Sequence, residues 1–520
     1  MYNKGPFANW VPKPVMLLLL LLILFPTLSI SGVYVSNATD ISGALATYTE
    51  FVALANNALA IGMGISIPVV LRFKMRFHTK KLVCSSAIIL AVLSYMNGTT
   101  DHPYVLVAGS FLIGFFKMFL MMEVVLPLMF IITPTGDRGR FYAVFYPISI
   151  GFTQFSSYYF AEQIAASNYQ SPYLIMSILM LCIALISLVF QHNDRFSFKT
   201  PLYQIDWLSM LLIGISAMGF NVFFTFLKQQ AWRASNVTTW AFIAGIVFLS
   251  LTIYRQKFLK RKLFKFDLFY KRTNVWHGLI LLVFMGIFLS TTTLFTNYTI
   301  AVLGYNNLIN ASSNLWMIPG IIAAGIYAFY SFKNNWNIKY YIASGFIAFF
   351  VHTLSLYLLI QPQMNIAYLE YALIWKGLGM GILFIGIWFY ASVGIAMDDM
   401  FGVMSLLLMF RSFLVTAMGT ALLSWAVYLG QWQSLADLSL YLDSSALGNG
   451  LALYPNLSLQ AAMASTKTVL GALCWMIVPI LTFVLTHSYG HFNYRRAVLL
   501  KRVINGSSIK GYRIKSTKKN

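Results

Sequence analysis

Fourteen runs of apolar residues follow one another along the chain, each bounded by charged residues or by clusters of Gly, Pro and Asn. A helix needs about 20 apolar residues to cross the hydrocarbon core of a bilayer. The pattern therefore predicts fourteen transmembrane helices, with ends accurate to a few residues. The predicted spans are 15–35, 51–71, 82–97, 104–130, 141–161, 173–190, 207–227, 237–254, 276–299, 314–332, 340–360, 368–393, 401–428 and 464–487.

The first apolar run has some features of a secretory signal peptide. Lys4 and Lys13 precede the string MLLLLLLILF, as in a basic region followed by a short apolar region. The apolar run continues past Pro26 to Val35, which is long enough to cross a bilayer. We therefore expect an uncleaved first span.

Composition supports an integral membrane protein. The chain has 520 residues, of which 59% are hydrophobic and only 10% charged, and its mean hydropathy is +0.72. Soluble domains carry about 25% charged residues, which excludes a soluble enzyme with a peripheral anchor. The strands of a transmembrane barrel alternate polar and apolar residues, so long apolar runs also exclude that class. The predicted fold class is all-α and integral to the membrane.

The net charge of +22 is explained by topology rather than by nucleic-acid binding. Cytoplasmic loops of membrane proteins collect Lys and Arg. With the N-terminus inside, the inner segments hold 30 of the 36 basic residues, and the outer segments hold only Lys228, Arg233 and Lys467. The sequence therefore predicts a multi-pass protein of a cell membrane, expected to be a bacterial inner membrane, with both termini cytoplasmic.

Several strings resemble the fourteen-span drug:proton antiporter branch of the major facilitator superfamily. The span count, the cytoplasmic ends and the basic loop after the eighth span agree with that branch. QIDWLSMLLIGISAMGF resembles the family's entry to its first extra helix, and LGYNNLINASSNLWMIPG resembles its approach to span 10. KGLGMGILF and MFRSFLVTAMGTAL resemble its glycine motif in span 12 and its Arg-x-x-Gly motif in span 13. The strings cover 204–220, 303–320, 376–384 and 409–422.

The chain departs from the family at several positions. The family's motif between spans 2 and 3 carries Gly, Asp and Gly, where this chain has Leu71, Met75 and His78. The basic residues of that inner-loop motif remain. GFTQFSSYYFAEQ replaces the family's Gly-Pro-Gly-Gly antiporter motif in span 5, so the direction of transport is not fixed by that motif. The retained basic residues are Arg76, Lys80 and Lys81.

The resemblance implies a domain organisation and a function. Residues 1–200 would form a six-helix bundle, 201–275 a two-helix insert with a basic cytoplasmic linker, 276–487 a second six-helix bundle, and 488–520 a basic cytoplasmic tail. The implied protein is a monomeric secondary transporter that exports hydrophobic or amphipathic small molecules by alternating access, coupled to protons. The alternatives are a metabolite or siderophore carrier on the same fold, and an integral membrane enzyme or sensor.

Four charged residues lie within predicted spans, where a charge costs a few kcal/mol and is a functional candidate. Lys117, Glu123, Lys376 and Arg411 are therefore candidates for proton coupling or gating. Structural alternatives exist for three of them. Arg411 could brace two helices through carbonyl groups, Lys376 could extend outward to the interface, and Glu123 could pair with Arg138 or Arg140.

Polar and aromatic residues within spans suggest a substrate cavity. Gln154 and Tyr158 lie one helical turn apart on the same face of span 5, and Asn297 belongs to a polar stripe in span 9. Trp316 and Trp375 could stack an amphipathic or cationic substrate. Hydrogen bonding between helices and core packing are the alternative explanations for these two groups.

Neither a cofactor nor a catalytic site is indicated. The chain has no Gly-rich phosphate loop of the Walker type, so ATP is not expected to drive it. His487 and His491 lack a third metal ligand and an intervening glutamate, and Cys84, Cys182 and Cys474 form no spacing pattern. We therefore expect a protein that is not an enzyme and has no metal and no nucleic acid partner.

Overall fold

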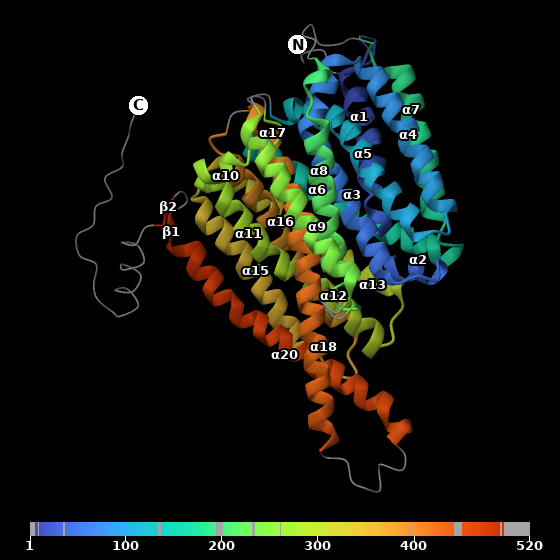
Figure 1. The fold of residues 1–520 in the computed structure, drawn as a ribbon, viewed down its shortest axis with the longest axis vertical. Helices are drawn as coiled ribbons and strands as arrows, with labels where there is room; N and C mark the ends of the chain where they lie inside the picture. Colours follow the sequence, from blue (N-terminus) through green and yellow to red (C-terminus); the bar gives the residue numbers. More distant parts are fainter. Residues whose placement is uncertain are drawn as a thin grey trace, which may run out of the picture.

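The computed structural model describes most of the chain as membrane-length helices that run side by side (Figure 1). Apart from a two-residue hairpin, in which β1 (His487–Ser488) pairs with β2 (His491–Phe492), the described secondary structure is helical. The expected basic tail after the hairpin and the basic residues Arg195 and Lys199 lie outside the described residues. Those described are 6–8, 10–34, 37–133, 137–193, 201–230, 235–259, 262–395, 397–440, 450–488 and 491–492.

Six long helices and two short ones make up the N-terminal half, which has its own apolar core. Within this half α3 packs along α5, and α4 packs along α7. The helices are α1 (Lys13–Ser29), η2 (Gly32–Tyr34), α2 (Ala38–Ala44), α3 (Thr49–Arg76), α4 (Thr79–Thr99), α5 (Pro103–Ile132), α6 (Arg138–Ala166) and α7 (Ser171–Phe190).

Two long helices and two short ones follow before the C-terminal half begins. They are η3 (Leu202–Gln204), α8 (Trp207–Phe226), α9 (Asn236–Phe258) and α10 (Asp267–Lys271). The C-terminal half comprises α11 (Thr273–Leu289), α12 (Thr291–Asn297), η5 (Tyr298–Val302), α13 (Asn307–Asn314), α14 (Met317–Lys333), α15 (Ile338–Leu359), α16 (Ile366–Ser392), α17 (Met397–Phe410), η6 (Arg411–Ala417), α18 (Met418–Ser439) and α20 (Gly450–Thr486).

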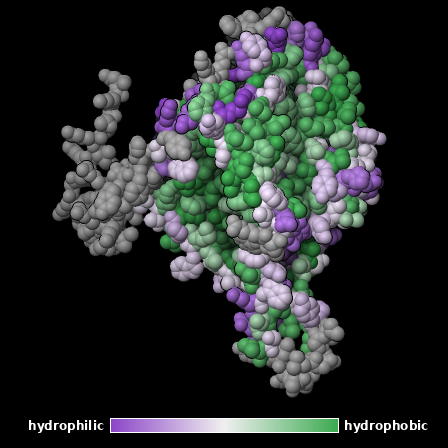
Figure 2. Space-filling model, viewed as in Figure 1, coloured by the Kyte–Doolittle hydropathy of each residue, from purple (hydrophilic) through white to green (hydrophobic). Residues whose placement is uncertain are grey.

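The number and order of helices follow the hydrophobic pattern. Among the described residues, thirteen helices are long and apolar enough to cross a membrane. The predicted fifth span corresponds to α6, which has 29 residues but carries two arginines and many hydroxyl groups, so its hydropathy is lower. Figure 2 shows a broad apolar surface over the middle of one face, with hydrophilic residues toward its ends. This all-helical arrangement agrees with the predicted fold class.

The two halves repeat one close helix contact. In the N-terminal half, a Cβ at Gly114 of α5 would overlap the backbone carbonyl of Leu59 in α3. In the C-terminal half, a Cβ at Gly377 of α16 would overlap the carbonyl of Met317 at the start of α14. Small residues let membrane helices approach until their backbones touch. The second and fourth long helices of each half are therefore fixed together by glycine.

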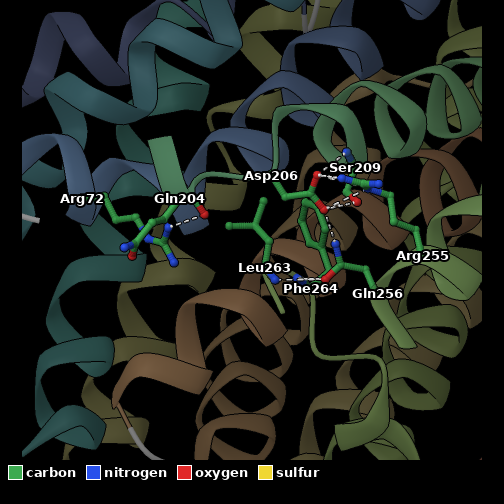
Figure 3. A network of polar contacts seen from close by, with 8 residues as sticks. All are labelled: Arg72, Gln204, Asp206, Ser209, Arg255, Gln256, Leu263 and Phe264. Carbon is green, nitrogen blue, oxygen red and sulfur yellow. Dashed lines mark hydrogen bonds and ion pairs between the residues drawn. The ribbon is translucent and has the colours of Figure 1, made fainter. Parts of the chain in front are cut away.

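The inserted helices lie against both halves. Helix α8 packs on α3 of the N-terminal half and on η6 of the C-terminal half. A polar network at one end of the bundle holds the segment that leads into α8 and the linker that follows α9 (Figure 3). Arg72 of α3 donates to the carbonyl of Gln204 at 3.0 Å, and Asp206 accepts from Arg255 of α9 at 3.0 Å. We call this end of the bundle, which includes the ends of α3 and α9 and the start of α6, the basic end.

The linker after α9 is held by the same network. Gln256 donates to Asp206 at 3.0 Å and accepts from the backbone N–H groups of Leu263 and Phe264. Lys265 then forms an ion pair with Asp399 of α17. The insert and linker therefore connect α3 with α17 at the basic end.

Two predicted boundaries differ from the structure. The short predicted span 82–97 is a full helix, α4, because its polar first residues still form helical turns. The predicted spans 401–428 and 464–487 leave residues 429–463 as a loop, but α18 continues to Ser439 and α20 begins at Gly450. These helices project beyond the bundle as a hairpin, at the end opposite the basic end (Figure 1). Helical propensity extends them past the apolar runs that define the spans.

Candidate functional site: a cavity between the two halves

A cavity of about 530 Å³ lies between the two halves of the bundle. Its wall includes residues of α1, α3, α5 and α6 from the N-terminal half and of α16, α17 and η6 from the C-terminal half. The volume falls within the range of about 300–1,000 Å³ that is usual for small-molecule sites. The wall runs from Asn56 and Gln154, near mid-helix, to Arg138 and Met400 at the basic end.

The charged side chains of the cavity wall are all basic. Lys117 of α5, Arg138 at the start of α6, and Arg411 at the start of η6 line it, and no Asp or Glu is among the lining residues of the described chain. Lys117 is 3% exposed and donates a hydrogen bond to the hydroxyl of Ser31, just after α1. Lys117 and Arg411 belong to different halves, so the cavity presents positive charge from both sides of the interface.

Arg411 is positioned by a local distortion of its helix. The helix that begins as α17 changes to π-helical turns over η6 and returns to α-helix at α18. Such π-helical segments occur often at functional sites. The guanidinium carbon of Arg411 lies 4.4 Å from the centroid of the Phe384 ring. This stacking holds the cation against α16 while its N–H groups remain available in the guanidinium plane.

The rest of the wall is mostly apolar and adaptable. Methionine contributes eight side chains and aromatic residues contribute seven. Methionine is unbranched and polarizable, so a methionine-rich wall can fit apolar bodies of different shapes. These residues are Met63, Met118, Met121, Met122, Met129, Met380, Met400, Met404, Phe141, Tyr142, Phe145, Tyr146, Phe384, Trp388 and Phe401.

Contacts between the halves close the cavity on the side away from the basic end. Asn307, at the start of α13, donates to Asp40 of α2 at 2.7 Å. Thr416 of η6 donates to Asn57 of α3 at 3.2 Å. Asn57 in turn donates to Asn221 of the inserted helix α8 at 3.0 Å. Asn57 therefore joins both halves and the insert, and together with Thr416 it also lines the cavity.

Comparison with known proteins identifies the fold. No family model matches the sequence, and no curated protein matches it. A bacterial homologue of the human lysosomal transporter Spinster, inward-facing and unoccupied, has a TM-score of 0.53 and 11% identity, covering 91% of this chain and 97% of that chain. A variant of a POT peptide transporter has a TM-score of 0.57 and 14% identity, covering 89% and 93%. The chain has the major facilitator fold.

A third solved structure agrees with this assignment. A variant of the nucleoside transporter NupG has a TM-score of 0.52 and 11% identity, covering 89% of this chain and 99% of that chain. At these identities the likeness concerns the fold. The major facilitator fold and the apolar spans together make this chain a multi-pass membrane protein.

Of the four charged residues that the sequence predicts for coupling or gating, two lie behind the cavity wall. Lys376 is 1% exposed and donates to Thr292 of α12 at 2.5 Å, so it points into the C-terminal half rather than outward to the interface. Glu123 is 2% exposed and accepts from Lys74 of α3 at 2.9 Å. The other oxygen of Glu123 is buried and has no hydrogen-bond partner.

The ion pair of Glu123 differs from the sequence-based alternative, in which Glu123 pairs with Arg138 or Arg140. Glu123 pairs with Lys74 of α3 and not with Arg138 or Arg140, which stand at the start of α6. Arg140 pairs instead with Asp137 at 3.0 Å, next to it at the start of α6. The partner Lys74 belongs to the string LRFKMRFHTKKL, which sequence reasoning assigned to the inner loop. The structure places Lys74 inside α3, 4% exposed.

The structure also corrects the predicted cavity wall. Gln154 lines the cavity, but Tyr158, one turn further along α6, does not, because the cavity does not extend that far along the helix. Asn297 is exposed at the end of α12. Trp316 and Trp375 are 41% and 44% exposed on the outer surface of the bundle and are not among the lining residues. In a membrane-spanning fold these tryptophans would face lipid.

The basic residues of the inner-loop motif lie at the basic end, away from the cavity. Arg76 ends α3, and Lys80 and Lys81 stand in the first turn of α4. None of the three lines the cavity. Their assignment to the family's inner-loop motif stays a prediction. Within the described residues, no group of three or more His, Cys, Asp and Glu side chains lies together as a metal site requires.

Sequence reasoning missed several residues of the cavity. Asn56 and Asn57 form a polar pair inside the apolar run of α3, and that pair was the available signal. Tyr142, Tyr146 and Trp388 could not be separated from ordinary core aromatics without the helix packing. Only the arrangement of α6 and α16 around the interface brings them into the wall.

Proposed function

We propose that this chain is a secondary active transporter that moves an amphipathic small molecule across the membrane by alternating access. The observation that carries the proposal is the cavity between the two halves, which has polar and charged groups near its middle and an adaptable apolar wall. In repeat-built transporters, substrate sites lie at the interface of the two repeats near the membrane midplane. Rocking of the halves would expose such a cavity to each side in turn.

The contacts between the halves are compatible with rocking. The contact of Asn307 with Asp40 and that of Thr416 with Asn57 are single hydrogen bonds between polar groups. The neutral Thr416–Asn57 bond is worth about 0.5–1.5 kcal/mol in net terms and the bond to the Asp40 carboxylate about 1.5–3 kcal/mol, so a bound substrate could offset their loss. Alternation would break these contacts and form others elsewhere along the interface of the halves.

Protons are the proposed driving ion. Glu123 is a deeply buried carboxyl group with one oxygen on Lys74 and the other without a partner. Its neighbours Met121 and Met122 line the cavity, so a change in its charge would be felt at the wall. Lys117, Lys376 and Arg411 are the proposed gating cations. Export is the proposed direction, as in the drug:proton antiporter branch that the sequence resembles.

The test is flux through purified protein in sealed vesicles. Proteoliposomes loaded with an amphipathic dye would receive an imposed pH step, and dye movement would be followed by fluorescence. We expect saturable flux whose direction reverses with the sign of the pH step. Flux that occurs equally in protein-free vesicles would contradict the transport function. Flux that ignores the pH step but follows a sodium gradient would contradict proton coupling alone.

A metabolite or siderophore carrier on the same fold is the second candidate. The solved structures of similar fold include transporters of nucleosides and peptides. The same vesicles loaded with a nucleoside, a dipeptide or an iron-free siderophore would separate this candidate from an exporter of amphipathic compounds. Competition between such a solute and the dye would indicate one shared cavity.

A further inference from the structure

Among the described residues that line the cavity, the charged side chains are basic and none is a carboxylate. Lys117 and Arg411 line it, and neither forms an ion pair with a carboxylate in the described part of the chain. A buried charge without a partner is unfavourable by several kcal/mol in a low-dielectric interior. The only hydrogen bond of the Lys117 ammonium in the described chain goes to the neutral hydroxyl of Ser31.

The carboxylates of the described chain that could balance these charges are engaged or placed elsewhere. Glu123 pairs with Lys74 inside the N-terminal half. Asp40 accepts from Asn307 at the end opposite the basic end. Asp399 pairs with Lys265 at the basic end. Within the described part of the chain, a ligand that enters the cavity therefore meets cationic side chains and no acidic one among the lining residues.

From this arrangement we propose that the ligand of the cavity is an amphipathic organic anion. Its anionic group, a carboxylate, sulfonate or phosphate, lies between Lys117 and Arg411, and its apolar body lies against the methionine and aromatic side chains. The proposal rests on the proposed transport function and names the substrate class. It differs from the cationic alternative that the sequence suggested for a substrate stacked on Trp316 and Trp375.

The two cations come from opposite halves, so an anion bound to both would bridge the halves. Arg411 stacks on Phe384, which leaves its N–H groups directed along the guanidinium plane, where they match the oxygens of a carboxylate or sulfonate. Lys117 supplies a compact charge from α5 of the other half. One anionic group can then draw the two halves together, and release of the anion would let them separate.

The apolar wall selects the shape of the apolar part of the ligand less strictly than the cations select the charge of its anionic group. Methionine side chains such as Met63, Met121 and Met404 adapt to different shapes, and Phe145 and Trp388 offer flat surfaces. The cavity volume of about 530 Å³ suits one aromatic or single-chain amphiphile rather than a two-chain phospholipid. We therefore expect broad selectivity for the body and strict selectivity for negative charge.

Two dyes with the same rings provide a direct test. Anilinonaphthalene sulfonate carries a sulfonate, and phenylnaphthylamine is the same ring system without it. Binding would be measured with the full-length purified protein in nanodiscs of zwitterionic lipid, after subtraction of empty nanodiscs. We expect the sulfonate to bind at least about tenfold more tightly than the neutral dye, the gain usual for hydrogen bonds to charged groups. Nanodiscs without anionic lipid exclude a lipid phosphate as the competing occupant.

Variants of the two cations make the test specific to this cavity. Arg411→Gln and Lys117→Gln should each weaken sulfonate binding about tenfold or more, with little change for phenylnaphthylamine. Lys333→Gln removes an exposed charge at the end of α14, outside the cavity, and should change neither affinity. Arg411→Lys and Lys117→Arg keep the charges and should retain most of the sulfonate affinity, which separates loss of charge from loss of folding.

The outcomes separate the ligand class from transport. Equal affinity for the two dyes, tighter binding of the cation ethidium, or unchanged sulfonate binding in both Gln variants would overturn the proposal. Flux of ethidium without charge-dependent sulfonate binding would keep the transporter and discard the anion. Charge-dependent sulfonate binding without any flux in proteoliposomes would keep the anion site and discard transport.

Discussion

Lys117 and Lys376 stand in corresponding helices of the two halves, and each donates to a hydroxyl group on or beside the first helix of its own half. Lys117 of α5 bonds to Ser31, and Lys376 of α16 bonds to Thr292. Each lies near a glycine that fixes its helix to the second helix of that half. The symmetry is incomplete, because only Lys117 lines the cavity.

This difference predicts different transport defects for the two lysines. Lys117→Met should abolish binding and transport, and its thermal stability should not fall, because removal of a buried charge relieves a cost of about 3 kcal/mol on insertion scales. Lys376→Met should lower the maximal rate and leave the KM nearly unchanged, because Lys376 does not contact the cavity. Rate curves in proteoliposomes measure both constants. A normal rate in a well-expressed Lys117→Met protein would remove that residue from the mechanism.

The glycine contact between α3 and α5 predicts a stability defect. At Gly114 an added Cβ would overlap the Leu59 carbonyl, which belongs to backbone and cannot rotate away. Overpacking typically costs about 1–3 kcal/mol, and Gly114→Ala should therefore lower the free energy of unfolding by this amount or more. Gly43→Ala is the matched control, since nothing lies within 4 Å of a Cβ at that position. Thermal unfolding of detergent-solubilised protein measures both, and equal melting temperatures would contradict the contact.

The sequence predicts the spans well because membrane insertion depends on local apolar length, which the hydrophobic pattern records. Which residues form the cavity wall depends on helix packing and is harder to predict from the sequence. The spacing of Gln154 and Tyr158 gives a shared helix face but does not show how far along α6 the cavity extends. The contact of Lys117 with Ser31 joins residues 86 positions apart, and no local pattern encodes it.

The same limit applies to the partner of Glu123. Helical periodicity shows that Glu123 and Lys117 point in different directions, but it cannot select Lys74 from the basic residues at the end of α3. That choice follows from the close packing of α3 on α5, which the glycine contact sets. The charge of the cavity likewise becomes visible only when Arg411 and Lys117, from different halves, are seen in one wall.

The network at the start of α8 predicts a stability that depends on pH. Burial alone would raise the pKa of Asp206, but hydrogen bonds from Arg255 and Ser209 and the charge of Arg255 outweigh it, and the pKa falls below its usual value of 3.8. When folding lowers the pKa of a carboxyl group, its ionised form stabilises the fold at pH values above the pKa of the unfolded chain. This contribution is lost as the pH falls through the pKa of the folded protein. Asp206→Asn should therefore destabilise the protein at neutral pH by about 1–3 kcal/mol.

The difference between wild type and Asp206→Asn should shrink as the pH falls below 3.8, where Asp206 becomes protonated. Melting temperatures measured across this range test the sign. Asp437→Asn is the control, because Asp437 is exposed on the projecting hairpin and forms no ion pair with another described residue. A constant difference at all pH values would show that the charge of Asp206 does not act in the network.

The predicted orientation can be tested with two introduced cysteines. Asp437 lies on the projecting hairpin, and Lys271 lies at the basic end, where α10 ends. After replacement of Cys84, Cys182 and Cys474, an impermeant maleimide added to intact cells should label Asp437→Cys and spare Lys271→Cys. Permeabilised cells should show labelling of both. The reversed pattern would place the basic end outside and contradict the topology inferred from the positive charges.

The ion pair of Glu123 with Lys74 carries the last prediction, which concerns coupling. Glu123→Gln removes the titrating group but keeps its shape. If protons drive transport through Glu123, substrate exchange should persist in this variant, while accumulation driven by a pH gradient should fail. Glu123→Asp should keep part of the accumulation.

The variant also breaks the buried ion pair of Lys74 with Glu123, which costs about 3–5 kcal/mol when one partner of a buried pair is removed. Glu123→Gln should therefore melt at a lower temperature, and the double variant Glu123→Gln with Lys74→Met should recover stability without recovering coupling. This separates the two roles of the pair, because stability depends on charge balance and coupling depends on a group that binds a proton. Gradient-driven accumulation in the stable double variant would show that the proton travels through another residue.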